Sequence, residues 1–434
     1  MSSSYTGTPS FGKRFRLILR ESGTVREMGG EEMSLAVGIV DSIFTNALDT
    51  DASDIHLQPE RNQLRIRFRQ DGILQDAGQL PPEQAQNVLT RLKLAAGMRI
   101  DEMREPQDGR IDMEYGGRRL SARASCVPAL NGEKMVLRLL DPVAMKVELP
   151  KLGMPEDMLK NWMRAIQMPY GMIIVTGPTG SGKTSTLYAS INQLDSKTRN
   201  IVTVEDPVEY EFEKNIAQVQ VTERLTFPKV MRSFLRQDPD VMMVGEMRDA
   251  ESLNIGIQAA LTGHLVLTTL HTNNAVETIS RMLDMKAERF LIASTVVAIL
   301  GQRLVRLVCG RCRQPYKPTE DEIAMLRLKE GHLAGGKFMK GVGCDACRGT
   351  GYKGRTGVFE LIMGTHAFRQ AVADTTSMDS IVRAAREQGY RTMLEDGVMK
   401  VVNGWTTPDE VIRAVYTQVV DKPVGVEPMV STEA

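Results

Sequence analysis

The chain has 434 residues, 42% of them hydrophobic and 25% charged, which is long enough for about two to four domains of ordinary globular composition. Lys and Arg together number 54, as do Asp and Glu, so the overall charge provides no basic field for non-specific binding of nucleic acid. The longest apolar run, Phe290–Leu300, falls short of the roughly 20 residues that cross a bilayer, and nothing resembles a signal peptide, so we expect a cytoplasmic protein.

The first third of the chain predicts a short N-terminal extension, residues 1–36, and then a small α+β domain over 37–149. An amphipathic helix and a turn open this domain. The alternation of apolar residues with arginine over 63–70 predicts a half-buried strand. A helix over 82–98 and three short strands within 109–141 complete the expected domain.

The pattern of apolar residues changes after a linker that begins at Pro150, and residues 150–300 predict an α/β core. Its apolar strands are continuous rather than alternating, which is typical of parallel strands covered on both faces. These strands are expected at 171–177, 201–207, 240–246 and 264–271. A Gly- and Cys-rich subdomain over 301–360, a region of three or four helices over 361–420 and a disordered tail over 421–434 should follow.

The stretch "GPTGSGKT" is the strongest chemical signal in the chain. It fits the phosphate-binding pattern G-x-x-x-x-G-K-[ST], follows an apolar strand and opens a helix. Its glycines let backbone N–H groups surround phosphates, and the helix N-terminus adds a favourable dipole. Lys183 can neutralise the β- and γ-phosphates, and Thr184 can ligate Mg²⁺. We therefore expect ATP binding by Gly177, Pro178, Thr179, Gly180, Ser181, Gly182, Lys183 and Thr184.

Three further strands end in polar residues: Glu205 with Asp206, Glu246, and His271. Ligands of an open parallel sheet bind beyond the carboxyl ends of its strands, so these side chains should converge on the phosphate loop. One carboxylate would hold Mg²⁺ and the other would orient the attacking water. The residues alone leave open which glutamate is the principal general base.

His264 and His271 flank one apolar strand. Seven residues of strand span about 23 Å at roughly 3.3 Å per residue, so both histidines cannot touch one phosphate. We expect His271 to reach the nucleotide as a γ-phosphate sensor, and His264 to lie at the far end of the strand, where it would contact another domain or subunit.

Four of the five cysteines form two C-x-x-C pairs, which match a four-thiolate zinc site. The predicted ligands of this structural Zn²⁺ are Cys309, Cys312, Cys344 and Cys347. Such a closed site has no open position for substrate. Cys126 lies in a predicted strand and is expected to be a small buried hydrophobic residue.

The small first domain is rich in arginine. Such residues on half-buried strands often form only a solvated face, but phosphate-loop enzymes commonly need an added cation for the transition state. The candidates are Arg67, Arg69, Arg104, Arg110, Arg118, Arg119, Arg123 and Arg138.

The chain resembles the type II secretion and type IV pilus ATPases over residues 37–420. The blocks that carry the resemblance, in order, are "ASDIHLQP", "PQDGRI", "GPTGSGKTSTLYA", "VEDPVEY", "LRQDPDVMMVGEMRD", "ALTGHLVLTTLHTN" and "GYKGRTGVFEL". The resemblance implies a homohexamer whose subunits have a small PAS-like α+β domain, a RecA-like ATPase core, a tetracysteine zinc subdomain and a helical C-terminal region.

Site residues carry over position by position. The resemblance gives Glu205 as the acidic-box residue that activates water, Glu246 as the Walker B glutamate near Mg²⁺, and His264 with His271 as the histidine box. By this resemblance His264 is expected among the nucleotide-binding residues. Arg110 and Arg123 match the first-domain arginines that reach the γ-phosphate.

The resemblance also implies peripheral association with the inner membrane through partners, chiefly a platform protein that extrudes pilin-like subunits. The sequence leaves open whether a membrane-anchor protein is also a partner, because the segment before residue 37 is shorter than the docking domain of secretion ATPases. No specific nucleic-acid partner is expected. Three alternatives remain: a pilus retraction motor, which the zinc cysteines disfavour; a RecA-like nucleic-acid translocase, which the balanced charge disfavours; and a non-catalytic scaffold, which the intact nucleotide residues disfavour.

Overall fold

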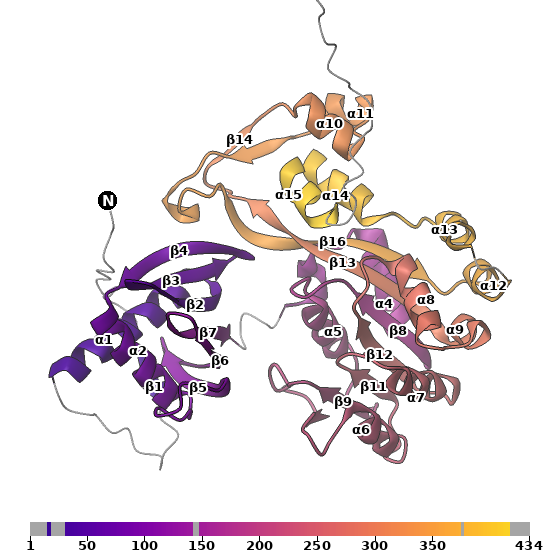
Figure 1. Ribbon diagram of the computed structural model, residues 1–434. Helices are drawn as coiled ribbons and strands as arrows, with labels where there is room; N and C mark the ends of the chain where they lie inside the picture. Colours follow the sequence, from indigo (N-terminus) through magenta and orange to yellow (C-terminus); the bar gives the residue numbers. More distant parts are fainter. Residues whose placement is uncertain (1–14, 19–30, 142–146, 375–376, 417–434) are drawn as a thin grey trace, which may run out of the picture. The chain divides into compact units, whose positions relative to one another are not determined.

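The computed structural model describes residues 15–18, 31–141, 147–374 and 377–416 (Figure 1). The chain divides into two compact units, residues 1–147 with 207–212, and residues 148–206 with 213–434. The expected tail over 421–434 and most of the expected extension lie outside the described residues. No helix in the described part of the chain is both long and apolar enough to span a membrane.

The first unit is an antiparallel sheet of order β1-β5-β6-β7-β2-β3-β4 with two helices packed on it. Alternate residues of β3 are buried against those helices, as the apolar–arginine alternation predicted. The helices are α1 (Glu31–Asp49) and α2 (Pro82–Ala95). The strands are β1 (Phe15–Ile18), β2 (Ala52–Glu60), β3 (Gln63–Gln70), β4 (Ile73–Leu80), β5 (Gln107–Tyr115), β6 (Arg118–Ala129) and β7 (Gly132–Leu140).

Three strands of this unit, β1, β2 and β4, were not expected from the sequence; β4 follows the turn at residues 71–72 and pairs with β3. Strand β1 lies within the expected extension and pairs with β5, so part of residues 1–36 belongs to the sheet. Strand β2 occupies the expected turn and pairs with both β3 and β7 at the middle of the sheet. Asp54 and Pro59 within β2 mask its strand pattern, because both residue types are rare in strands.

The second unit is built on a sheet of order β10-β9-β11-β12-β8-β13-β16. All neighbours are parallel except β13 and β16, which confirms the parallel strands expected from the continuous apolar runs. Strands β8 and β12 are buried along their whole length. The strands are β8 (Gly171–Thr176), β9 (Ile201–Glu205), β10 (Ile216–Gln220), β11 (Val241–Val244), β12 (Leu265–Leu270), β13 (Val296–Val308) and β16 (Tyr352–Met363).

Helices surround this sheet (Figure 1). They are α4 (Glu156–Ile166), α5 (Lys183–Asn192), α6 (Phe227–Phe234), α7 (Ala250–Leu261), α8 (Ala275–Asp284) and α9 (Arg289–Thr295). Buried apolar side chains of α6, α7, α8 and α9 form one core with β8, β9, β11 and β12. The expected linker at Pro150 is a short 3₁₀ helix, Leu149–Leu152.

Strands β13 and β16 run side by side well beyond the rest of the sheet (Figure 1). The expected boundary between residues 300 and 301 therefore falls inside β13. The chain between the two strands forms α10 (Glu320–Leu326), α11 (Glu330–Gly335), the short pair β14 (Arg313–Pro315) and β15 (Met339–Gly341), and a 3₁₀ turn at Asp345–Cys347.

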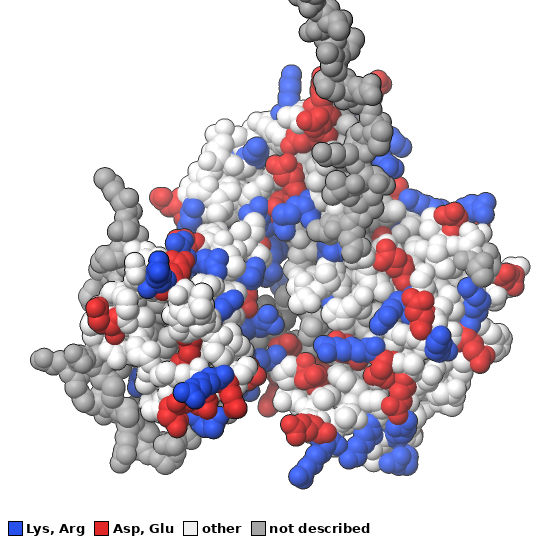
Figure 2. Space-filling view, in the orientation of Figure 1, with Lys and Arg blue, Asp and Glu red and all other residues white. Residues whose placement is uncertain are grey.

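Four C-terminal helices follow within residues 364–374 and 377–416, in agreement with the expected three or four. They are α12 (His366–Asp374), α13 (Met378–Arg386), α14 (Met393–Val402) and α15 (Pro408–Val415). Thr407 caps α15 and Pro408 opens it. Helices α14 and α15 pack on β13 and β16 in a second apolar cluster. On the face in Figure 2, basic and acidic side chains are interspersed, in keeping with their equal numbers.

Candidate nucleotide and metal sites

The phosphate loop joins the end of β8 to the start of α5, as the sequence predicted. Gly177, Gly180 and Gly182 have φ angles of 151°, 78° and 88°, which side chains rarely adopt. A Cβ at Gly177 would also lie 2.4 Å from the carbonyl oxygen of Gln302. The loop therefore needs glycine for its path, and it leaves the first N–H groups of α5 free for an anion.

Lys183 is folded back onto the loop that precedes it. Its Nζ donates to the carbonyl oxygens of Gly177 at 2.8 Å and Pro178 at 3.1 Å. Burial lowers the pKa of Lys183 to about 8; the charge of Glu246 opposes this shift and that of Arg303 adds to it. The amine can exchange its two carbonyl acceptors for phosphate oxygens without leaving the loop.

Glu246 and His271 meet beside Lys183. Glu246 follows β11 and accepts from Arg248 at 2.7 Å, and its other oxygen lies 3.3 Å from Nε2 of His271. Burial lowers the pKa of His271, as does the charge of Lys183, while Glu246 raises it. Since the net shift is downward from 6.5, the imidazole is neutral at pH 7 and above. The structure thus brings together three of the residues expected to converge.

Glu205 has different surroundings. Its side chain is buried and accepts hydrogen bonds from Tyr188, from Thr203 at 2.6 Å and from Gln218 at 3.2 Å. The carboxylate oxygens expected to face an attacking water are therefore engaged by protein donors. This distinction had no sequence signal, because both glutamates end apolar strands.

His264 lies just before β12 and His271 just after it. The carbonyl of His264 accepts from Gly171 at the start of β8, whereas the phosphate loop follows the end of that strand. Its Nδ1 lies 2.9 Å from the carbonyl oxygen of Ala259, at the end of α7. Within this unit His264 is not brought to the phosphate loop, so its expected place among the nucleotide-binding residues is not supported, whereas the far-end position inferred from strand length is.

Two residues of β13 contact the site and were missed in the sequence. Gln302 bonds to Ser181 and Thr186, and Arg303 donates to the carbonyl oxygen of Asn273 at 3.2 Å. More than a hundred residues separate Gln302 from its partners in the chain, so no local spacing could reveal the contact.

Arg110 and Arg123 belong to the first unit. They are direct cross-strand partners in β5 and β6, and Arg123 is in turn opposite Arg138 in β7. Arg123 pairs with Glu209 at 3.0 Å and Arg110 with Asp112 at 3.0 Å. Like charges directly opposite in a sheet repel one another, and Arg138 also has a carboxylate partner, Asp54 at 3.0 Å, so each arginine of this row is neutralised within the unit.

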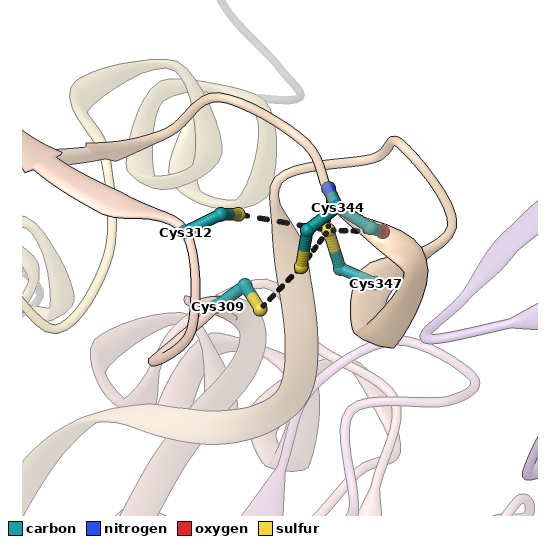
Figure 3. Close-up of side chains that lie close together, drawn as sticks. All are labelled: Cys309, Cys312, Cys344 and Cys347. Atoms are coloured by element: carbon teal, nitrogen blue, oxygen red, sulfur yellow. Dashed lines mark hydrogen bonds between the residues drawn. The ribbon is translucent and has the colours of Figure 1, made fainter.

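The four predicted cysteine ligands form one cluster. Figure 3 shows their sulfur atoms facing one another from the chain after β13 and from the 3₁₀ turn. All four sulfurs lie within 4.8 Å of each other, with Cys309–Cys344 at 3.9 Å and Cys312–Cys347 at 3.7 Å. Tetrahedral zinc with Zn–S bonds of about 2.3 Å requires S···S separations of about 3.8 Å, so the residues fit this metal.

Backbone groups support the cluster. The N–H groups of Cys344 and Gly351 point to Sγ of Cys347 at 3.2 Å and 3.3 Å. Burial raises the pKa of Cys347, but hydrogen bonds from these N–H groups and from the thiols of Cys312 and Cys344 together lower it, to about 6 overall. A thiolate is the form that binds metal.

A parallel sheet with a phosphate loop at its carboxyl edge defines a P-loop nucleotide-binding protein. The family described as "Type II/IV secretion system protein" matches residues 31–413. The chain therefore belongs to this family of secretion ATPases, and the resemblance drawn from the motifs is confirmed.

Curated relatives and solved structures agree with this assignment. The chain is 44% identical to type II secretion system protein E of Pseudomonas aeruginosa over 388 residues, 89% of this chain and 76% of that protein. It is 41% identical to the type IV pilus assembly ATPase PilB of Thermus thermophilus over 381 residues, 87% of this chain and 43% of that protein.

Two solved structures share the fold. The pilus retraction motor PilT with bound ADP has a TM-score of 0.55 and 28% identity, covering 84% of this chain and 96% of that one. The ATPase DotB of Legionella pneumophila has a TM-score of 0.63 and 21% identity, covering 86% and 94%. The expected α/β fold class is confirmed, and the protein is an ATPase of the secretion family.

Proposed function

We propose that this ATPase is a homohexameric motor at the cytoplasmic face of the inner membrane that powers type IV pilus assembly or extension of a type II secretion pseudopilus. The observation that carries the proposal is the meeting of Lys183, Glu246 and His271 beside the phosphate loop. The family membership supplies the pathway, through relatives of both kinds.

In this proposal the loop N–H groups and the N-terminus of α5 bind the β- and γ-phosphates of ATP. Lys183 leaves its carbonyl acceptors to neutralise those phosphates, and the hydroxyl of Thr184 ligates Mg²⁺. The helix dipole and the lysine together favour the negative charge that develops on the transferred group.

Glu246 is the better candidate for orienting the attacking water. Its carboxylate is 13% exposed and lies beside Lys183, whereas the carboxylate of Glu205 is held by Tyr188, Thr203 and Gln218. Glu205 then joins α5 to β9 and β10 through these hydrogen bonds and does not orient the attacking water. The neutral imidazole of His271 has a single N–H, which can donate to Glu246 in the free protein or to the γ-phosphate when ATP is bound, but not to both at once. Hydrolysis is a direct in-line attack with no covalent intermediate.

The first unit supplies the added cations. We propose that Arg110 and Arg123 exchange their carboxylate partners for the γ-phosphate when the subunits close on ATP. This exchange couples nucleotide state to movement of the first unit, and that movement would act on an inner-membrane platform protein. A structural Zn²⁺ held by the four cysteines would fix the chain between β13 and β16.

The pathway is tested by the amount of pilin on the cell surface when Lys183→Ala replaces the native chain. Loss of surface pilin indicates pilus assembly, and an unchanged amount with exported enzymes trapped in the periplasm indicates a secretion pseudopilus. Excess surface pilin indicates a retraction motor and contradicts the proposal. The exposed Lys197→Ala should match the native strain.

A further inference from the structure

Gln302 lies where β13 passes the phosphate loop. The pairing of β13 with β8 ends at Gly301 opposite Thr176, the last residue of β8. Gln302 is therefore level with the first residue of the loop, and its side chain is only 2% exposed. A buried carboxamide must have partners for both its oxygen and its nitrogen.

Both partners belong to the phosphate loop and its helix. Nε2 of Gln302 donates to the carbonyl oxygen of Ser181 at 2.7 Å. The hydroxyl of Thr186, one turn into α5 and fully buried, donates to Oε1 of Gln302 at 2.8 Å. One side chain thus joins the loop and the first turn of the helix to a strand that neither of them adjoins in sequence.

The backbone around Gln302 is equally close to the loop. A Cβ at Gly177 would lie 2.4 Å from the Gln302 carbonyl oxygen, and one at Gly182 would lie 3.0 Å from Nε2. The strand therefore touches both ends of the glycine-rich segment. In contrast, the hydroxyl of Ser181 is buried and has no protein partner in the described structure, as expected of a group left free for a ligand.

We propose that Gln302 is a positioning residue that holds the phosphate loop in its nucleotide-binding conformation. It acts through Ser181 and Thr186 and does not itself touch the nucleotide. The inference rests on the proposed nucleotide site. Without the bridge, the carbonyl of Ser181 is left buried without this donor and the glycine-rich loop gains conformations, so binding must then order the loop.

The test measures the Kd for Mg·ATP, KM, kcat and the thermal midpoint of the full-length chain. Gln302→Met keeps the volume and removes both bonds. We expect it to raise Kd and KM by about tenfold, since it loses the hydrogen bonds to both Ser181 and Thr186, with kcat changed less than about threefold. The same substitution at the exposed Gln258 on α7 is the matched control and should leave all four quantities unchanged.

Substitutions at Thr186, the other partner of Gln302, provide a second and independent test. Thr186→Val removes the hydroxyl and should raise Kd about threefold to tenfold, whereas Thr186→Ser keeps the donor and should bind ATP like the native chain. Adding Thr186→Val to Gln302→Met should cost little more affinity, because the two residues share one bond.

A native Kd in Gln302→Met together with a lowered thermal midpoint would overturn the proposal, because the residue would then serve stability alone. If Gln302→Met does not fold, the Thr186 pair decides: equal affinities in the Val and Ser variants overturn the proposal, and a loss confined to Val supports it. Lys183→Ala separates the two claims. If Lys183→Ala binds ATP as tightly as the native chain, the proposed nucleotide site is wrong. If Lys183→Ala loses affinity for ATP while Gln302→Met keeps the native affinity, only the positioning role of Gln302 is wrong.

Discussion

At the scale of single residues, the two glutamates at the ends of β9 and β11 differ in what surrounds them. Glu246 shares its carboxylate with Arg248 and His271 close to Lys183, and Glu205 is enclosed by hydroxyl and amide donors. An attacking water needs access to a carboxylate oxygen, and the side chain of Glu246 is 13% exposed whereas Glu205 is 3% exposed. The difference leads to opposite expectations for the two conservative substitutions.

Glu246→Gln should lower kcat at least about 100-fold and leave ATP binding largely intact, because the general base contributes typically 10²–10⁴ to the rate. Glu205→Gln should instead lower the thermal midpoint, since its new amide would face donors, with a smaller effect on kcat. Phosphate release in single-turnover experiments measures the rate of hydrolysis, and thermal unfolding measures the midpoint. An inactive Glu205→Gln with a native midpoint would contradict this assignment.

Lys183 should make ATP binding pH-dependent. Its pKa of about 8 in the free protein lies below its usual value of 10.5, so the amine loses its proton as pH rises through 8. Bound phosphates favour the charged form, so affinity should fall above pH 8 and binding should take up about one proton at pH 9 and almost none at pH 6.5. Titration calorimetry in buffers of different ionisation enthalpy measures the uptake. Lys183→Arg should abolish it, and equal uptake at both pH values would be inconsistent with this pKa.

The residues of the phosphate loop could be predicted from sequence because eight adjacent positions carry the chemistry. The partners of Gln302 and the donors around Glu205 could not, because they come together only when β13, β10 and α5 pack. Which carboxylate is enclosed depends on Tyr188 and Gln218, neither of which belongs to a catalytic pattern.

At the scale of elements, the six residues of β12 keep its two histidines at opposite ends of the sheet. Strand length alone predicted this separation, since rise per residue is nearly constant. The length of β13 was not predictable in the same way. Its sequence runs from an apolar stretch into arginine-containing residues, and only the pairing with β16 keeps the later part in the sheet.

The cysteine cluster predicts a metal-dependent element between β13 and β16. The purified chain should contain about one Zn²⁺, and Cys344→Ser should lose it and lower the thermal midpoint, because a structural metal contributes directly to folding. Elemental analysis and thermal unfolding measure these effects. Cys126→Ala, which removes a buried thiol of the first unit, should keep the zinc. Full zinc content in Cys344→Ser would exclude the four-thiolate site.

At the scale of the whole molecule, the division into units does not follow the chain. Residues 207–212 come directly after β9 but belong to the first unit, where Glu209 pairs with Arg123. A boundary placed by changes in composition cannot detect such a segment, because only six residues cross over. The expected boundary near residue 150, in contrast, lies close to the observed one after residue 147.

If the protein is the proposed hexamer, in which Arg110 and Arg123 reach ATP only when subunits associate, its specific ATPase activity should rise with protein concentration. Arg123→Ala should lower kcat on the order of 10³-fold at saturating concentration, as loss of a transition-state arginine does. Arg118→Ala, which removes an exposed arginine paired with Asp141 in the same unit, should be nearly neutral. Activity assays combined with sedimentation measure both. A monomer that is fully active at all concentrations would rule out the shared site.

Every role proposed above depends on ATP hydrolysis at the phosphate loop. The decisive measurement is the steady-state rate of phosphate release by the purified chain with Mg·ATP, compared between the native sequence, Lys183→Ala and Lys197→Ala. We predict that Lys183→Ala lowers the rate at least about 100-fold, because it removes a charge that stabilises the transferring phosphoryl group. Lys197→Ala should keep the native rate. Equal rates in all three proteins would show that hydrolysis does not occur at the phosphate loop.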